Sequence, residues 1–130
     1  MILFTNIFAQ DSHWEKLIVE KILKSMTNKE DIMVYTTDKG LKSLVSNIKD
    51  ITLINSCQKA DFILSLRDRN ISCHKPEVVF DYANYLYNKN AVGLFFWQKG
   101  RPTIRFSSKR LENFGLHIHG ELSKFVSSKN

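Results

Sequence analysis

The stretch from Asp31 to Ile54, DIMVYTTDKGLKSLVSNIKDITLI, decides the fold because it reads as strand, helix and strand in succession. Ile32–Thr36 is apolar and rich in strand-forming residues, and Asp38 can cap the helix that follows. Ile51–Ile54 is a second apolar strand. Between the strands, apolar residues recur at positions i, i+3, i+4 and i+7, which predicts a helix with one buried face: Leu41, Leu44, Val45 and Ile48.

Further strands follow this unit. Phe62–Leu66 is almost entirely apolar, as expected for a strand covered on both faces, and Val78–Phe80 is a shorter one. Tyr82–Asn88 predicts a weak helical turn. Ala91–Trp97 and Thr103–Phe106 then form a hairpin whose turn contains Gln98-Lys99-Gly100. The order predicts a single α/β domain with a mostly parallel sheet, flanking helices and an antiparallel edge hairpin.

Helix signals bracket these strands. Ser12-x-x-Glu15 is a capping box, and the residues after it share helical spacing and predict one buried face: Trp14, Leu17, Ile18, Ile22 and Met26. At the other end Ser107 or Ser108 caps a helix with Leu111 and Phe114, and Gly115 stops it. A last helix is expected to begin near Gly120, with Leu122, Phe125 and Val126 facing inward.

The composition is that of one ordinary globular domain. The chain has 130 residues, 43% of them hydrophobic and 25% charged, with two cysteines and a formal net charge of +6. Disordered, collagen-like and disulfide-knot scaffolds are therefore excluded. Most of the positive excess falls after residue 96, which indicates either an acidic partner or a solvated basic surface.

The opening stretch MILFTNIFAQ is apolar at seven of its first nine positions and has no basic residue. We expect residues 1–9 to be the remnant of a signal peptide and residues 10–130 to form the domain; the alternative is an edge strand over Ile2–Phe8. Export would allow a disulfide between Cys57 and Cys73. A strand between the two cysteines argues against it, because the chain must travel back along most of that strand.

The segment from Gly93 to Leu122 resembles the C-terminal part of the YfiR-like family of small periplasmic proteins. The match begins with Gly93 and Leu94-Phe95, followed by Gly100-Arg101. An alternating strand, Ile104–Phe106, comes next. Further positions keep the family's spacing: Ser107, Gly115, Leu116, Ile118 and Leu122. The first helix departs from the family pattern, since it has no Trp-Pro ending.

The resemblance implies one α/β domain like a lobe of a periplasmic binding protein, with no catalysis and no cofactor. It also implies a regulator that contacts the periplasmic domain of a membrane signalling protein, either a diguanylate cyclase or a sensor kinase. The expected location is the periplasm, and no nucleic-acid partner is expected. The sequence has no run of about 18 apolar residues, so we do not expect the chain to span a membrane as a helix. An open sheet edge would also permit a homodimer.

Two surfaces are candidate binding sites. Aromatic residues beside arginines on the hairpin predict a protein interface formed by Phe95, Trp97, Arg101 and Arg105. The alternative is that helices cover both faces and the aromatic residues belong to the core. The carboxyl ends of the strands predict a ligand crevice at Thr36, Thr37, Asp38, Arg67 and Asp81. The alternative to a ligand crevice is that Asp38 acts only as a helix cap.

Other patterns are weaker. His117-x-His119 places two imidazoles on one side of an extended segment and is a weak metal candidate, with exposed loop histidines as the alternative. The basic hairpin with its aromatic residues also fits a nucleic-acid-binding domain, and the crevice fits a small-anion-binding domain. These remain the two alternatives to a non-enzymatic periplasmic regulator.

Overall fold

A seven-stranded sheet forms the centre of the protein. The computed structural model describes residues 2–66 and 73–128, with side chains from His13 onward. The strand order is β2-β1-β3-β4-β5-β6-β7, and neighbours are parallel except for β5 and β6. This confirms the predicted α/β class. The strands are β1 (Ile32–Tyr35), β2 (Ile51–Leu53), β3 (Phe62–Ser65), β4 (Glu77–Val79), β5 (Ala91–Gln98), β6 (Arg101–Ser107) and β7 (Val126–Ser127).

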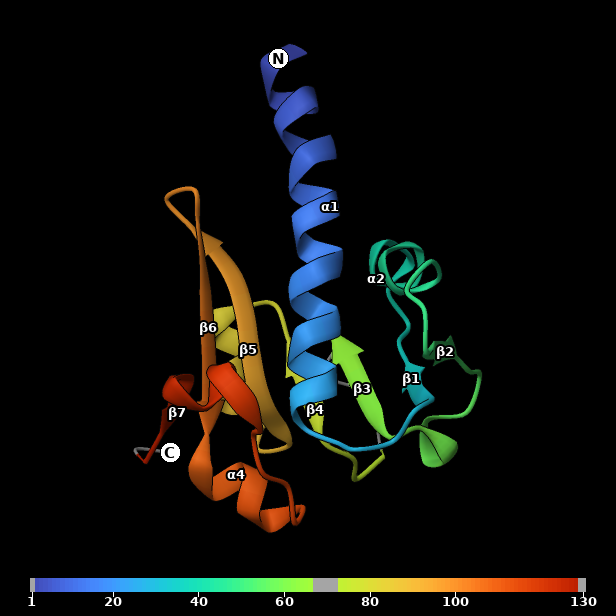
Figure 1. Ribbon diagram of the computed structural model, residues 1–130, viewed down its shortest axis with the longest axis vertical. Helices are drawn as coiled ribbons and strands as arrows, with labels where there is room; N and C mark the ends of the chain where they lie inside the picture. The colour runs from blue at the N-terminus through green and yellow to red at the C-terminus, as the bar shows by residue number, and fades with distance from the viewer. Residues whose placement is uncertain (1, 67–72, 129–130) are drawn as a thin grey trace.

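Helices cover both faces of the sheet. Helix α1 (Ile2–Ser25) crosses the front of the sheet in Figure 1, and α2 (Lys39–Val45) packs beside it. Both helices bury their apolar residues in the larger core cluster, with Val19, Ile22 and Val45 completely buried. Helix α3 (Tyr82–Tyr87) packs through Tyr85 on a second cluster. The remaining helices are α4 (Ser108–Asn113) and the 3-10 helices η1 (Cys57–Lys59) and η2 (Gly120–Phe125).

Two short helices, α2 and α4, begin where the sequence predicts a cap. The side chain of Asp38 accepts a hydrogen bond from the backbone N–H of Leu41, 2.9 Å away. Ser107 caps α4 in the same way through Arg110 N, and Gly115 ends that helix with a φ of +69°. These caps satisfy backbone donors that have no partner inside the helix.

The C-terminal elements differ from the prediction in two ways. The expected last helix is the 3-10 helix η2, and β7 follows it as a strand parallel to β6. The antiparallel hairpin is therefore not at the edge of the sheet, because β7 lies outside it.

A bulge in β5 decides which hairpin side chains are buried. The pairing of β4 with β5 shifts between Glu77 and Val78, so Val92 and Phe95 both reach the larger core although they are three residues apart. A β-bulge places two residues opposite one and reverses the alternation of side chains. Gly93 lies at the bulge, and a Cβ there would be 3.2 Å from the Phe106 ring.

The N-terminal helix is longer than predicted. It begins at Ile2 and passes through Ser12, so Ser12 is not its N-cap, and the alternative edge strand over Ile2–Phe8 is wrong. The expectation that residues 1–9 are a signal-peptide remnant stays a prediction.

Cys57 and Cys73 form a disulfide, with their Cα atoms 6.1 Å apart. The sequence argued against this bridge because the chain must travel back along the strand between the two cysteines. The topology of the sheet explains why it does so. Strands β3 and β4 are parallel neighbours, so both begin at the same end of the sheet. Cys57 lies just before β3 and Cys73 just before β4, and the chain has to return there in any case.

Tyr85 gives a testable pH dependence. Burial raises the pKa of its phenol above the ordinary 10.0, although the Arg110 guanidinium, 5.0 Å from the ring centroid, opposes this shift. The unfolded chain therefore loses this proton first, and stability falls as the pH rises above about 10. We expect Tyr85→Phe to reduce the loss of unfolding free energy between about pH 8 and about pH 11, measured by urea denaturation.

The matched control is Tyr87→Phe, which removes the phenol of a residue that is 77% exposed. It should show the same alkaline loss as the parent protein. An equal loss in the Tyr85→Phe variant would contradict the assignment to Tyr85.

Candidate functional site

An apolar surface lies on the outer flank of α1. Trp14 is 57% exposed and Leu17 40% exposed, whereas Val19, Ile22 and Leu23 on the inner side are completely buried. The prediction that Trp14 and Leu17 belong to the buried face is therefore wrong. Lys21 and Lys24 follow Trp14 and Leu17 at helical spacing and lie on the same side of α1. Charged residues at these positions indicate that this side faces solvent.

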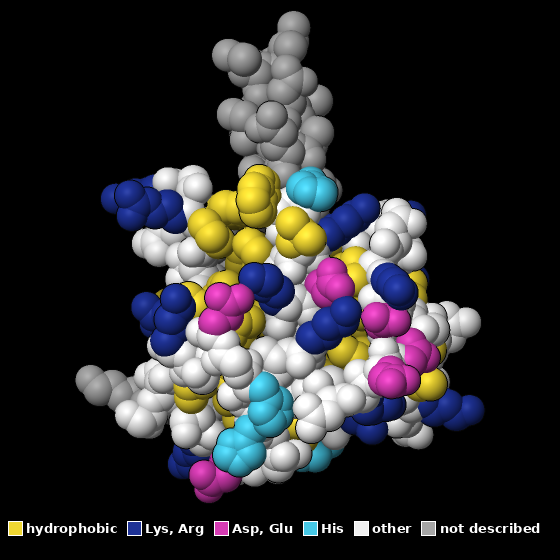
Figure 2. All heavy atoms as spheres, in the orientation of Figure 1, with side chains coloured by type: hydrophobic (Ala, Val, Ile, Leu, Met, Phe, Trp, Pro, Cys, Tyr) yellow, Lys and Arg dark blue, Asp and Glu magenta, His cyan; other side chains and the backbone are white. Residues whose placement is uncertain are grey.

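Trp97 of β5 extends this surface toward the hairpin. Its ring is half-buried, and its Nε1 donates a hydrogen bond to Glu15 Oε2 of α1 over 3.2 Å. This bond joins two segments that are 82 residues apart in the chain. We call Trp14, Leu17 and Trp97 together the α1–hairpin surface. Figure 2 shows hydrophobic side chains gathered over this part of the molecule, with charged side chains beside them.

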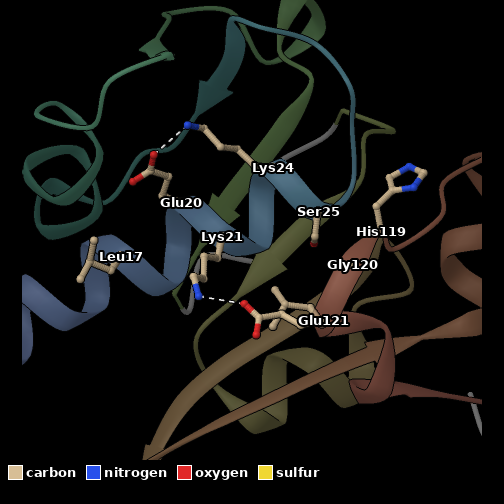
Figure 3. Close-up of a pocket in the computed structure, with 9 residues that line it drawn as sticks. Leu17, Glu20, Lys21, Lys24, Ser25, His119, Gly120 and Glu121 are labelled. Carbon is tan, nitrogen blue, oxygen red and sulfur yellow. Dashed lines mark hydrogen bonds and ion pairs between the residues drawn. The ribbon is translucent and has the colours of Figure 1, made fainter.

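A hollow of about 430 Å³ continues the surface between α1 and η2 (Figure 3). Leu17 and Leu122 supply apolar lining, and Glu20, Lys24 and His119 are among the polar residues around it. The backbone N–H of His119 donates to Ser25 O over 2.7 Å, which fixes η2 against the end of α1.

An ion pair crosses the mouth of the hollow. Lys21 Nζ lies 2.9 Å from Glu121 Oε1, and both side chains are exposed. The hydrogen bond from Lys21 holds the pKa of Glu121 below its usual value. On the other side Glu20 accepts a hydrogen bond from Lys24, which raises the pKa of Lys24. The rim of the hollow is thus charged with both signs.

The four residues predicted to form a partner interface do not lie together. Phe95 is 1% exposed and belongs to the core, so the prediction that it contacts a partner is wrong. Trp97 lies on the same side of the sheet as Phe95, the side covered by α1, but is only half-buried. Arg105 packs over the Tyr82 ring of α3, 5.9 Å from its centroid, and Arg101 is exposed at the start of β6. The hairpin therefore separates the aromatic residues from the arginines.

The predicted ligand crevice is only partly formed by the predicted residues. A hollow of about 570 Å³ lies between α1, α2 and the ends of β3 and β4, and Asp38 lines it together with Glu15, Lys16 and Phe80. Thr36 is buried and its hydroxyl accepts from Asp38 N, while Thr37 is exposed. Asp81 caps α3 through Asn84 N, and Arg67 lies outside the described residues.

The caps explain most of this chemistry. Both aspartates already accept hydrogen bonds from helix N–H groups, which the sequence predicted for Asp38 and not for Asp81. Sequence reasoning did not find that α1 supplies a carboxylate and an ammonium to the crevice.

The histidine pair lies near the hollow between α1 and η2, which His119 lines. His117 and His119 are both exposed in the segment before η2. Within residues 2–66 and 73–128, no three His, Cys, Asp or Glu side chains form a group able to hold a metal ion.

No protein-family model, curated protein or solved structure matches the chain significantly. In the described part of the chain, no helix has the length and apolar character needed to cross a membrane. The α1–hairpin surface thus combines two tryptophans and a leucine with an adjoining hollow whose rim carries both charges.

Proposed function

We propose that this protein is a non-enzymatic regulatory protein of the periplasm. It acts by contact with the periplasmic domain of a membrane signalling protein, either a diguanylate cyclase or a sensor kinase, as the resemblance to the YfiR-like family implies. The observation that carries this proposal is the exposure of Trp14 and Leu17 on the flank of α1, the helix that Trp97 contacts through Glu15. The disulfide Cys57–Cys73 supports an oxidising compartment.

The chemistry of the α1–hairpin surface suits a protein partner. Tryptophan is among the residues that most often dominate the energy of protein interfaces, because its large ring fills a pocket of the partner. The mixed charges of Lys21, Lys24, Glu20 and Glu121 around the adjoining hollow fit the polar rim that surrounds such an anchor. Rim charges of both signs orient a partner that has the complementary pattern.

The first test places a photo-crosslinking amino acid at position 14 in native cells. We expect a cross-link to a membrane protein that has a periplasmic domain and a cytoplasmic cyclase or kinase domain. The same amino acid at position 49, an exposed lysine outside the α1–hairpin surface and its hollow, serves as the control. Cross-links to RNA, to ribosomal proteins or to cytoplasmic enzymes would overturn the proposal.

A second test uses the purified periplasmic domain of the cross-linked partner. We expect Trp14→Ala/Leu17→Ala to weaken binding by roughly 100-fold in calorimetry, since two anchor residues at the centre of an interface are lost. Because both residues are exposed, the variant should keep the unfolding temperature of the parent protein. Lys49→Ala removes an exposed side chain elsewhere and should leave the affinity unchanged. Equal affinities of the double variant and the parent protein would contradict the assigned surface.

A further inference from the structure

A second candidate surface lies on α3, on the face of the sheet opposite α1. Tyr82 is 43% exposed, Leu86 49% and Tyr87 77%, so this helix presents most of its apolar side chains to solvent. A hollow of about 410 Å³ lies beside them, between α3 and α4. We call it the α3–α4 pocket. Its lining residues are Leu86, Tyr87, Lys89, Lys109, Arg110 and Asn113.

Arg110 holds the wall of this pocket in place. Its Nη1 donates to the carbonyl oxygens of Tyr85, at 2.6 Å, and Ala91, at 3.0 Å, and its Nη2 donates to Leu86 O at 3.3 Å. The guanidinium also lies over the Tyr85 ring. A cation that hydrogen-bonds the last carbonyls of a helix stabilises that end of the helix. These bonds join α4 to the end of α3 and the start of β5, and Arg110 adds its charge to the pocket.

The charge of the α3–α4 pocket has one sign. Lys89, Lys109 and Arg110 line it and no acidic residue does. The ion pairs formed among the described residues use Lys21, Lys24 and Lys29, and none of them includes Lys89 or Lys109. Both lysines are exposed, so their ammonium groups can reach an anionic partner.

We propose that the α3–α4 pocket binds an acidic peptide segment of a protein, with an apolar side chain seated against Leu86 and Tyr87 and carboxylates facing Lys89 and Lys109. A concave site between two helices favours a narrow segment, whereas a bilayer presents a broad surface. The apolar residues beside the cations distinguish the site from one that binds phosphates by charge alone. This site lies across the sheet from the α1–hairpin surface, so one molecule can hold two partners.

The test uses the purified, oxidised protein and a synthetic peptide of about ten residues in which aspartates and glutamates flank one leucine and one phenylalanine. A second peptide has the same apolar residues with asparagine and glutamine in place of the acids. In NMR titrations we expect the acidic peptide to shift the amide signals of Leu86, Tyr87, Lys89 and Lys109. The neutral peptide should not do so.

The decisive variant is Lys89→Glu/Lys109→Glu, compared with Lys42→Glu/Lys49→Glu, which changes the net charge equally at two other exposed lysines. We expect the first variant to bind the acidic peptide roughly tenfold more weakly, and the second to bind it with unchanged affinity. Leu86→Ala keeps every charge and should weaken binding roughly fivefold. Binding should also weaken as ionic strength rises from about 0.1 M to about 1 M.

Three results would overturn the proposal. The first is a similar loss in both charge-reversal variants, because binding would then depend on net charge alone. The second is acidic-peptide binding that shifts signals elsewhere and leaves the pocket unaffected. The third is that the protein does not bind the peptide but binds phosphatidylglycerol vesicles or a single-stranded oligonucleotide, and that the Lys89→Glu/Lys109→Glu variant loses this binding.

Discussion

Phe95→Ala is expected to lower the free energy of unfolding by about 3–5 kcal/mol, measured by urea denaturation followed by circular dichroism. The ring is 1% exposed and lies between the sheet and α1. Its centroid is 6.1 Å from that of Phe80 and 5.8 Å from that of Trp97. Removing it leaves a cavity that these neighbours can only partly fill, which adds to the lost transfer free energy of the ring.

The adjacent residue provides the control. Phe96 is half-buried and packs against the second cluster, with its ring 6.2 Å from the exposed Tyr82. We expect Phe96→Ala to cost on the order of 1–2 kcal/mol, since less apolar area returns to water and no closed cavity forms. Equal costs for the two substitutions would contradict the assignment of Phe95 to the core, and a larger cost for Phe96→Ala would reverse it.

This comparison also shows where sequence reasoning stopped. Strand alternation correctly separates Phe95 and Trp97 from Phe96, but it does not say which set faces inward. The bulge at Gly93 decides that, because it brings Val92 and Phe95 to the same core. In the local sequence only the glycine itself indicates the bulge. The nearby Phe106 ring, which favours a glycine at this position, belongs to another strand.

Other elements followed from local rules. The strand–helix–strand unit after Asp31 is predictable because periodicity, the Asp38 cap and the apolar strands all agree. The cap at Ser107 and the stop at Gly115 depend on short-range hydrogen bonds and on a positive φ, which a few residues specify.

The extent of α1 was harder to predict. The capping-box pattern at Ser12 predicts a helix start, yet the helix continues to Ile2. Such a pattern names residues able to cap a helix, and they do so only where the backbone before them is not helical. The exposure of Trp14 and Leu17 is a tertiary property, since it depends on which side of α1 meets the sheet.

The disulfide carries the second large prediction. We expect reduction of Cys57–Cys73, or the double substitution Cys57→Ser/Cys73→Ser, to lower the stability by about 3 kcal/mol, because the bridge closes a loop of about 15 residues in the unfolded chain. The midpoint of thermal unfolding should fall on the order of 10 °C. A reductant should lower the unfolding midpoint of the parent protein to that of the double variant. It should leave the midpoint of the variant unchanged. If the reductant has no effect on the parent protein, the bridge is absent or contributes nothing.

The same bridge tests the compartment, because its presence in cells depends on the redox environment. The protein is isolated from its native cells after rapid alkylation of free thiols, and the state of Cys57 and Cys73 is determined by mass spectrometry. A periplasmic regulator should have both cysteines unalkylated and joined. Alkylation of both cysteines would indicate a reducing compartment and would contradict the proposed partner, whose periplasmic domain would then be out of reach. In that case the stability loss on reduction would still hold for the purified protein with the bridge formed, since it depends on the loop that Cys57–Cys73 closes.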